Sequence, residues 1–507
     1  MLEDLLAAAV VVFNWQTIAA ISLGTIVGLM IGAIPGLSAT MGMALLSPFT
    51  FFVGPLIGIP FLIGLFKGGT FGGSVSAILI GTPGTAANAA TLLDGYEMRK
   101  QGKASEALMG ALNASLVGDA FGTVALIFGA PALALIAIQF GPHEFFALVL
   151  FSLTMICYVS GRSLAKGVLA ASLGVFFALI GTDPIGGTQR LSFGLPELQG
   201  GLNVIALVTG LFGIAEVLIQ MESFGRTGKP AADSIGVRIA GTGMQLGAAA
   251  THLWTIVRSS LVGTFIGALP GIGSETSPWV AYGLAKRASK NPEKFGHGAF
   301  EGVVAPEAAN NAVCAAAMIP MLVFGIPGDI VTAILMSALI AQGLQPGPFL
   351  ISEHRDVIFG LFMSVLFATA ALYIFGRLTM RWWIKVLTIP RPLLYSIVVA
   401  FCVVGTYSVK SSSFDLAVMF VFGIVGYAMR KLDIAIAPML LSFVLAKILE
   451  ESLRRGLIQS DGNLLAFFER PITAIILVLT ALVLVTFGYL ELRRRRRGKR
   501  GGNDETA

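Results

Sequence analysis

Long apolar runs recur along the chain from its first residues to Tyr489, and short polar segments separate them. Many of these runs are long enough to cross a bilayer, which takes about 20 residues of helix. The short alternating strands of an outer-membrane barrel are absent from the pattern. We therefore predict an all-α polytopic membrane protein with roughly ten to twelve transmembrane helices.

The first predicted helix covers Leu5 to Ile34, with an interruption around Asn14 to Thr17. The segment Thr182 to Gly201 carries Gly, Pro and Asp183, and we expect it to lie outside the membrane. The other predicted helices cover residues 107–140, 144–160, 164–180, 202–220, 253–269, 299–324, 330–340, 357–375, 393–407, 416–427, 434–448 and 472–490.

Three glycine-rich segments interrupt the apolar sequence near its start. They are Gly32 to Thr40, a predicted turn at Lys67 to Ser74, and Ile80 to Asn88. Backbone groups freed by such helix breakers cannot face lipid, so they must be buried in protein or line a polar cavity. The segments are therefore a candidate binding site.

The first and third of these segments have partners later in the chain. Gly267 to Thr276 repeats the Pro-Gly pattern of Gly32 to Thr40, and Gly325 to Asp329 repeats that of Gly81 to Thr85. The two offsets agree closely, at 235 (271 − 36) and 244 (328 − 84) residues. Interrupted segments at corresponding places in two halves indicate the binding site of a secondary transporter.

Charges in matching loops indicate that the two repeats are inverted. Residues 286–294 are strongly basic, whereas the matching residues 51–55 are uncharged. After Pro83-Gly84 and its partner Pro327-Gly328, the charge difference is reversed. Here the first-half residues 99–103 are basic and the second-half residues 342–348 carry no charge. Cationic loops face the cytoplasm, so matching loops are predicted to lie on opposite sides of the membrane.

The candidate site is built from the four Pro-Gly breaks. Helix N-termini at such breaks direct N–H groups and partial positive charge at an anion, which suits a carboxylate substrate. Unwound carbonyls with a carboxylate suit Na⁺ or H⁺, and we assign cation coupling to Asp329, Thr40 and Thr85. The predicted substrate-binding residues are Pro35, Gly36, Ser38, Thr40, Lys67, Thr82, Pro83, Gly84, Thr85, Asn88, Pro270, Gly271, Ser274, Glu275, Thr276, Asn310, Asn311, Pro327 and Gly328.

Five ionisable residues lie at apparent membrane depth, where burying a charge is expensive and marks a functional candidate. Asp329 is the first choice for cation coupling because it abuts a Pro-Gly break. Lys67 either meets a substrate carboxylate or extends from a helix end to the membrane surface. Asp119 and Glu216 are expected to pair between helices, and Glu307 is the fifth residue.

A simpler interpretation is that Ser, Thr and other small residues only let helices pack closely. For any single Ser or Thr, this packing interpretation is as good an explanation as a role in binding. It does not account for the whole duplicated arrangement, because packing alone does not require repeated helix breaks.

Composition and charge support a membrane protein and argue against a soluble one. Charged residues make up 12% of the 507, about half of the roughly 25% found in a soluble domain. The net charge of +6 lies in short basic clusters and in the run Arg493 to Arg497 that follows the last apolar segment. This distribution indicates cytoplasmic loops and a cytoplasmic C-terminus that contacts anionic lipid, and it argues against nucleic-acid binding.

Enzyme and cofactor motifs are absent from the sequence. The three cysteines and four histidines are widely separated and have no metal-ligand spacing. A phosphate-binding Gly-x-x-x-x-Gly-Lys-Ser/Thr loop is also absent. We therefore expect no enzymatic activity and no cofactor other than a coupling ion, Na⁺ or H⁺.

Polar segments divide the chain into five predicted parts. Residues 1–221 form the first transmembrane repeat with one half of the site, and residues 222–247 form a polar linker. Residues 248–450 form the second repeat with the other half. The last polar loop and the final transmembrane helix occupy 451–492, and a basic cytoplasmic tail occupies 493–507.

These motifs closely resemble the large membrane subunit of the tripartite tricarboxylate transporters, the TctA family. The resemblance covers nearly the full length and rests on Pro35 to Thr40, Lys67 to Ser74, Gly81 to Thr85, Asp94-Gly95-Tyr96, Pro270 to Gly273 and Gly325 to Gly328. It implies a bacterial inner-membrane symporter with two partners, a small integral membrane subunit and a periplasmic solute-binding protein. It also implies an elevator-type fold with paired re-entrant hairpins. Relatives handle citrate and other tri-, di- or monocarboxylates, so the substrate stays open.

Two other functions stay open at this point. An ABC-type permease would be energised by a separate ATPase, and it would need a cytoplasmic coupling loop and no ion site. A channel or a membrane scaffold would not show saturable, competable uptake.

Overall fold

The computed structural model describes residues 12–159, 163–227, 251–271, 273–380, 382 and 391–501. These residues are mostly helical and include one two-stranded sheet. Nine of the described helices are long and apolar enough to cross a membrane, which confirms the all-α polytopic class. The described part of the chain thus holds fewer full-length spans than the predicted ten to twelve, because five other apolar helices have only 10–17 residues.

Two compact units make up the structure, and each is formed by two separate stretches of chain. Unit 1 comprises residues 1–137 and 203–427, and unit 2 comprises residues 138–202 and 428–507. The five predicted parts are drawn from the sequence repeat, whereas the two units are defined by how compactly the chain folds. The five-part division therefore stays a prediction. Within the predicted linker, residues 228–247 lie outside the described residues.

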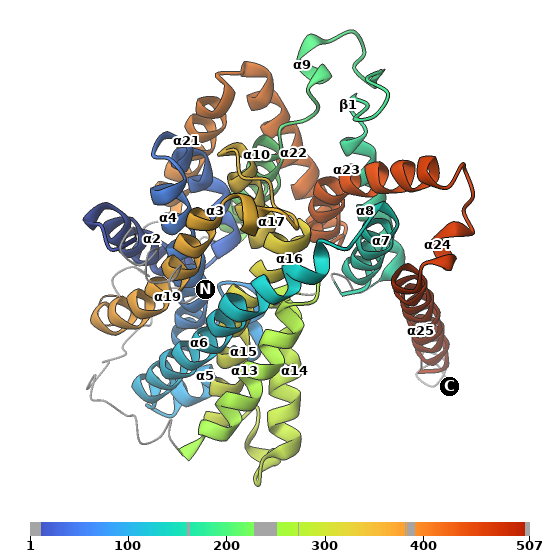
Figure 1. The fold of residues 1–507 in the computed structure, drawn as a ribbon. Coiled ribbons are helices and arrows are strands. Elements are labelled where there is room, and N and C mark those ends of the chain that lie inside the picture. Colours follow the sequence, from blue (N-terminus) through green and yellow to red (C-terminus); the bar gives the residue numbers. More distant parts are fainter. Residues whose placement is uncertain are drawn as a thin grey trace. The chain divides into compact units, whose positions relative to one another are not determined.

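Unit 1 contains the helices before and after the predicted linker, and Figure 1 shows their course. Its elements are α2 (Trp15–Ala33), α3 (Ala39–Leu46), η1 (Ser47–Phe52), α4 (Pro55–Ile80), η2 (Ala86–Asn88), α5 (Ala89–Lys100), α6 (Ala104–Ala137), α10 (Val204–Val208), the π-helix η3 (Thr209–Ile214), α11 (Ala215–Thr227), α13 (Leu253–Gly267), α14 (Gly273–Ala288), η4 (Pro292–Lys294), α15 (Phe300–Ala316), α16 (Met318–Phe324), α17 (Ile330–Ala341), α18 (Leu350–Glu353), α19 (Arg355–Leu378), α21 (Arg391–Lys410) and α22 (Ser413–Lys431).

Helix α2 begins at Trp15 after a cap at Asn14, inside the stretch Asn14 to Thr17 where an interruption is predicted. The Asn14 side chain accepts a hydrogen bond from the Thr17 N–H at 2.8 Å, which satisfies one of the free donors of the helix end. Residues 5–11 of the predicted Leu5–Ile34 helix lie outside the described residues.

The core of unit 1 is formed by α4 and by α15 with α16. In their most apolar windows 83% and 94% of the residues are buried, so these helices contact protein rather than lipid. Helix α2 packs against α4, and α13 packs against α15. The stretch Lys67 to Ser74 lies within α4, so the predicted glycine-rich turn is wrong.

Close backbone packing explains why a glycine-rich stretch is helical here. A Cβ atom at Gly28 of α2 would collide with the Leu65 carbonyl of α4, and one at Gly68 would collide with the Thr25 carbonyl of α2. Small residues at such interfaces let two helices approach until their backbones touch. The packing gained outweighs the low helix propensity of glycine, which costs about 1 kcal/mol per residue.

The same close contacts recur in the second half of the chain. Gly28 meets Leu65 in the first half, and Gly263 meets Ala309 in the second. The two partners are displaced by 235 (263 − 28) and 244 (309 − 65) residues, the same offsets as the Pro-Gly pairs. The contact between α2 and α4 therefore has a counterpart between α13 and α15.

Unit 2 is smaller and consists of four longer helices and one extended connection. Helix α23 packs against α7 and α8, and α25, which contains the predicted last span, packs against α7. Only 11% of the apolar window of α25 is buried, as expected of a helix that faces lipid. The elements are α7 (Pro142–Val159), α8 (Leu164–Ala178), β1 (Gly181–Thr182), β2 (Gln189–Arg190), α9 (Pro196–Gln199), α23 (Ile436–Gln459), α24 (Ala466–Glu469) and α25 (Pro471–Gly501).

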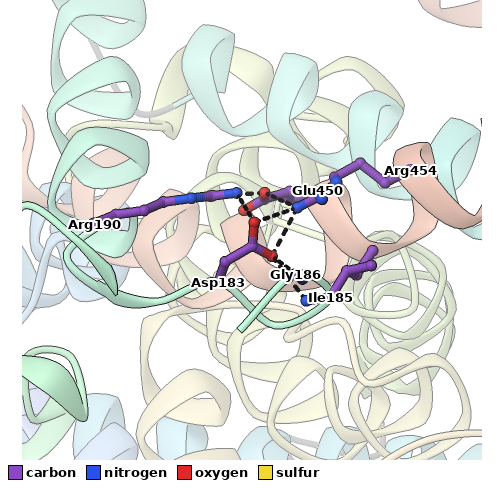
Figure 2. Close-up of polar contacts among 6 residues, drawn as sticks. All are labelled: Asp183, Ile185, Gly186, Arg190, Glu450 and Arg454. Atoms are coloured by element: carbon purple, nitrogen blue, oxygen red, sulfur yellow. Dashed lines mark hydrogen bonds and ion pairs between the residues drawn. The ribbon is translucent and has the colours of Figure 1, made fainter. Parts of the chain in front are cut away.

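A four-residue ion-pair cluster fastens the β1–β2 hairpin to α23, as Figure 2 shows. Asp183 follows β1, Arg190 ends β2, and Glu450 and Arg454 lie one turn apart on α23. Arg454 Nη1 lies 2.7 and 2.8 Å from the two carboxylate oxygens of Asp183, and Arg190 Nη1 lies 2.8 Å from Glu450 Oε1. Arg190 also pairs with Asp183. Two cations thus alternate with two carboxylates.

The cluster lowers the pKa of Asp183 well below its usual range. The hydrogen bond from Arg454 is the largest cause, and the backbone N–H groups of Gly186 and Ile185 and the Arg190 side chain add to it. Each of these groups stabilises the ionised carboxylate. The cluster therefore remains ionised over the whole physiological pH range.

Replacing Arg454 by Gln should loosen the hairpin, because Asp183 loses its main partner. We expect several-fold faster amide hydrogen exchange at residues 183–187. Arg455→Gln is the matched control, since Arg455 is exposed and pairs with Glu451 at 3.5 Å. Equal exchange in the two variants would contradict a fastening role for the cluster.

The stability of the β1–β2 hairpin should depend on pH in one direction only. Folding lowers the pKa of Asp183, so its stabilisation is present above the ordinary value of about 3.9 and is lost as pH falls through the lower folded value. Protection of the hairpin in the wild type should therefore be equal at pH 7 and pH 5 and should decline only in stronger acid.

Candidate functional site

Each of the four Pro-Gly breaks leads directly into the start of a helix. In the first half, α3 begins at Ala39 and η2 begins at Ala86. In the second half, α14 begins at Gly273 and α17 begins at Ile330. The first N–H groups of a helix have no partner within it and carry partial positive charge, so each break presents hydrogen-bond donors.

Left-handed glycines make the breaks at matching positions. Gly81 ends α4 with a φ of 75°, and Gly325 ends α16 with a φ of 68°. Gly36 and Gly271, which follow the prolines of the other two breaks, have φ values of 87° and 78°. Residues with a Cβ rarely adopt this conformation, which explains why glycine stands at these positions.

Contacts within each half bring its two breaks together. In the first half, a Cβ at Gly84 would meet the Gly32 carbonyl and the Cα of Gly73. In the second half, Gly273 at the start of α14 lies directly against Asp329. A Cβ at Gly328 would lie only 2.8 Å from the Ala317 Cα, and this pair of residues matches Gly84 and Gly73 at the 244-residue offset.

Contacts between the halves bring all four breaks into one region of unit 1. Helix α3 packs against α17, and α14 packs against η2. Figure 1 shows α3 next to α17, and it shows α5, α13, α14 and α15 grouped together. A helix that starts at a break of one half thus contacts a helix that starts at a break of the other half.

Polar pairs lie at matching positions of the two later helix starts, and the second-half pair caps its helix. Asp329 Oδ1 accepts from the N–H and the hydroxyl of Thr332, both at 2.8 Å, and Thr332 accepts in return from the Asp329 N–H. In the first half, Thr85 donates its hydroxyl to Asn88 Oδ1 at 2.5 Å. The two pairs are again 244 residues apart. At the remaining capped break, Ser38 accepts from the Met41 N–H at 3.1 Å.

Three predicted site residues carry buried polar atoms without a partner among the described residues. The atoms are Nδ2 and Oδ1 of Asn310, Oδ1 of Asn311 and Oδ2 of Asp329. An unpaired buried polar group costs roughly 1–3 kcal/mol, so such atoms are rare in native structures. They identify α15 and the start of α17 as places where a ligand can supply the missing hydrogen bonds.

The predicted site residues differ in exposure. Thr82 and Glu275 are exposed. The half-buried ones are Pro35, Gly36, Ser38, Thr40, Pro83, Gly84, Thr85, Ser274 and Thr276, and the buried ones are Asn88, Pro270, Gly271, Asn310, Asn311, Pro327 and Gly328.

Lys67 is fully buried in the middle of α4 and is bonded to the protein. Its Nζ lies 2.8 Å from Asp119 Oδ2, 2.7 Å from the Thr369 hydroxyl and 2.7 Å from the Val365 carbonyl. The predicted pairing of Asp119 between helices is confirmed. The alternative of a lysine that reaches the membrane surface from a helix end is wrong, because the ammonium has no exposed surface.

Glu307 of α15 is the residue that the sequence did not place in the site. It is fully buried, and Oε1 accepts from Thr91 at 2.5 Å and from Ser74 at 2.6 Å. Oε2 accepts from Ser115 at 3.3 Å. A glutamate at membrane depth was a visible signal, but the convergence of hydroxyls from α4, α5 and α6 on it depends on the fold.

Asp94 of α5 connects the first half to the segment before α15 and to α14 through hydrogen bonds. Its Oδ1 accepts from the N–H groups of Gly296, Gly298 and Ala299 at 2.8, 2.9 and 2.8 Å. Its Oδ2 accepts from the Tyr282 hydroxyl at 2.8 Å. The carboxylate therefore satisfies four donors of the second half, and it is itself fully buried.

Comparison with known proteins agrees with these motifs. A family model described as the tripartite tricarboxylate transporter TctA family matches residues 18–441. An Agrobacterium vitis protein named as an uncharacterized 52.8 kDa protein in the TAR-I ttuC' 3' region is 35% identical over 484 residues, 94% of each chain. An uncharacterized protein in the TAR-II ttuC' 3' region of the same organism is 40% identical over 235 residues, 46% of this chain and 97% of the relative.

Replacing Asp94 by Ala should destabilise the protein strongly, because four donors lose their shared acceptor. We expect a loss of at least about 3 kcal/mol, seen as a lower Tm in detergent. Glu97→Ala is the control, since Glu97 lies on the same helix and pairs with the exposed Lys100. If both variants melted like the wild type, the proposed tie would not stabilise the protein.

Proposed function

The chain belongs to the tripartite tricarboxylate transporter TctA family, and from that premise we propose that it is the permease subunit for ion-coupled uptake of a carboxylate. The membership makes it a component of a tripartite transporter. The proposal adds secondary-active transport, driven by Na⁺ or H⁺, across the bacterial inner membrane. Its substrate is a tricarboxylate such as citrate, or a di- or monocarboxylate.

One observation carries the proposal, namely the meeting of four helix starts from two halves in one region. Each start offers free N–H groups and partial positive charge, which together suit an anion with several carboxylate oxygens. The buried, unpaired amide of Asn310 adds a donor and an acceptor. Asp329 adds an unpaired carboxylate oxygen beside unwound backbone, which suits a coupling cation.

The matching contacts support a repeat on each side of the site. We propose that the two repeats are inverted, that the substrate sits between them near the membrane midplane, and that a domain built from them moves in an elevator-like way. The proposed partners are a small integral membrane subunit and a periplasmic solute-binding protein that delivers the carboxylate. The basic C-terminus lies in the cytoplasm in this topology.

Transport measurements with the complete three-component system test the proposal. Labelled citrate and smaller carboxylates are offered to membrane vesicles under an imposed Na⁺ or pH gradient. Uptake should be saturable, and it should stop when ionophores collapse the gradient while ATP is held constant. Uptake that follows ATP without a gradient would instead support an ABC-type permease, and unsaturable flux would support a channel.

Replacing Asp329 by Asn should abolish gradient-driven accumulation and leave the fold intact. Asn caps a helix as well as Asp does, so only the charge is lost. Asp415→Asn is the matched control, because Asp415 lies in the first turn of α22 and accepts from Asn203 at 2.7 Å, away from the breaks. Unchanged coupling in the Asp329 variant would refute its assignment.

A further inference from the structure

Glu307 is a buried carboxylate that neutral groups surround. Its three hydrogen-bond donors are the hydroxyls of Ser74, Thr91 and Ser115. Among the described residues, no Lys, Arg or His lies within ion-pair distance of it. A carboxylate in this setting lacks the counter-charge that normally compensates burial, so a mobile cation or a proton has to neutralise it.

Four of the buried titratable groups near α15 are bonded in pairs, whereas Nε of the half-buried Arg258 on α13 has no hydrogen-bond partner among the described residues. The elements that pack against α15 carry the buried groups Lys67, Asp94, Asp119 and Tyr282, and α15 itself carries Cys314. Lys67 is bonded to Asp119, and Tyr282 is bonded to Asp94. The Cys314 thiol lies 3.4 Å from the Thr70 hydroxyl. None of these groups is hydrogen-bonded to Glu307 within the described residues.

The geometry favours a proton over a metal cation at this position. The hydroxyls of Thr91 and Ser74 bond directly to Oε1 at 2.5 and 2.6 Å. At Oε1 a metal cation would have to displace these donors, whereas a proton requires only that one hydroxyl turn its hydrogen elsewhere. The atoms balance simply, because one O–H bond forms when the proton arrives and breaks when it leaves.

A hydrogen-bonded chain connects Glu307 with the first-half break. The Ser74 hydroxyl donates to Glu307 and accepts from Asn88 Nδ2 at 2.6 Å. Asn88 Oδ1 accepts from the Thr85 hydroxyl at 2.5 Å. Thr85 follows Gly84 in the break itself, so the chain runs from the buried carboxylate to the candidate site.

The direction of this chain depends on the charge of the carboxylate. An ionised Glu307 only accepts, so Ser74 and Thr91 both turn their hydrogens toward it. A protonated Glu307 becomes a donor, and the hydroxyl that accepts its proton must turn its own hydrogen elsewhere. When that hydroxyl belongs to Ser74, the rearrangement reaches Thr85 through a rotation of the Asn88 amide, which then presents Oδ1 to Ser74 and Nδ2 to Thr85.

We propose that Glu307 binds the coupling proton and that Ser74 and Asn88 transmit its protonation to Thr85 at the first-half break. The proposal rests on the proposed function, since it names the ion and its carrier for the same carboxylate transport. The proton enters from the side that supplies the substrate and leaves on the other side. Asp329 caps α17 at the second-half break, whereas Glu307, on a second-half helix, accepts from three helices of the first half.

Transport by Glu307→Gln in the complete transporter tests the proposal. The probe is the carboxylate that the wild type accumulates, and a pH dye inside the vesicles reports proton entry. We expect an imposed proton gradient to drive at least tenfold less accumulation in the variant, and substrate-linked proton entry to disappear. Exchange of labelled for unlabelled substrate should remain detectable, because exchange needs no net proton movement.

Two further variants keep the outcome decisive. Glu301→Gln is the matched control on α15, since Glu301 pairs with His252 at 3.5 Å, and it should transport like the wild type. Thr91→Val keeps the carboxyl group and removes one donor to its ionised form, so the pH profile of uptake should shift upward by at least about 0.5 unit. This second readout decides the question if Glu307→Gln fails to fold.

The outcomes separate this inference from the proposed function. A Glu307→Gln variant that accumulates substrate with the wild-type proton-to-substrate ratio overturns the inference, as does an unshifted pH profile in Thr91→Val. Wild-type uptake that responds to Na⁺ alone also overturns it, while the proposed carboxylate transport stands. A wild type that takes up no carboxylate under any gradient refutes the proposed function itself.

Discussion

Lipid cannot hydrogen-bond the backbone groups that a broken helix exposes, and the architecture of unit 1 follows from this constraint. Four breaks lie in its apolar sequence, so each must be enclosed by protein. The glycines of α2, α4 and α13 allow backbone contact, and that close packing encloses the breaks. The side chains of Asp329 and Ser38 then accept from N–H groups of helix starts that would otherwise stay unpaired.

Buried charges in unit 1 are stabilised in three different ways. Lys67 and Asp119 neutralise each other as a buried ion pair. Asp94 is held by three backbone N–H groups and a phenol, and it joins two halves of the chain. Glu307 is held by hydroxyls, which can donate or accept. Among the three arrangements, only this last one can accommodate a change of charge by rotation of its neighbours.

The sequence predicted the class and the breaks well because both depend on local composition. Apolar runs, Pro-Gly pairs and their offsets can all be read without knowing which helices touch. The helix through Lys67 to Ser74 was mispredicted because its stability comes from the glycines of α2, about 40 residues earlier in the chain. The bonding of Glu307 and the ion-pair cluster of the 181–190 hairpin were missed for the same reason. In both, the partners come from distant helices, and residue type alone does not pair them.

The contacts of Asp94 also have a consequence for how the protein is made. Its four partners lie between residues 282 and 299, so a ribosome that has just produced Asp94 must add about 200 more residues before the last partner exists. At 5–20 residues per second this takes roughly 10–40 s. During that interval the carboxylate needs water or another protein as a temporary partner. The amino-terminal half therefore enters the membrane unfinished, and its assembly is completed only when the second half arrives.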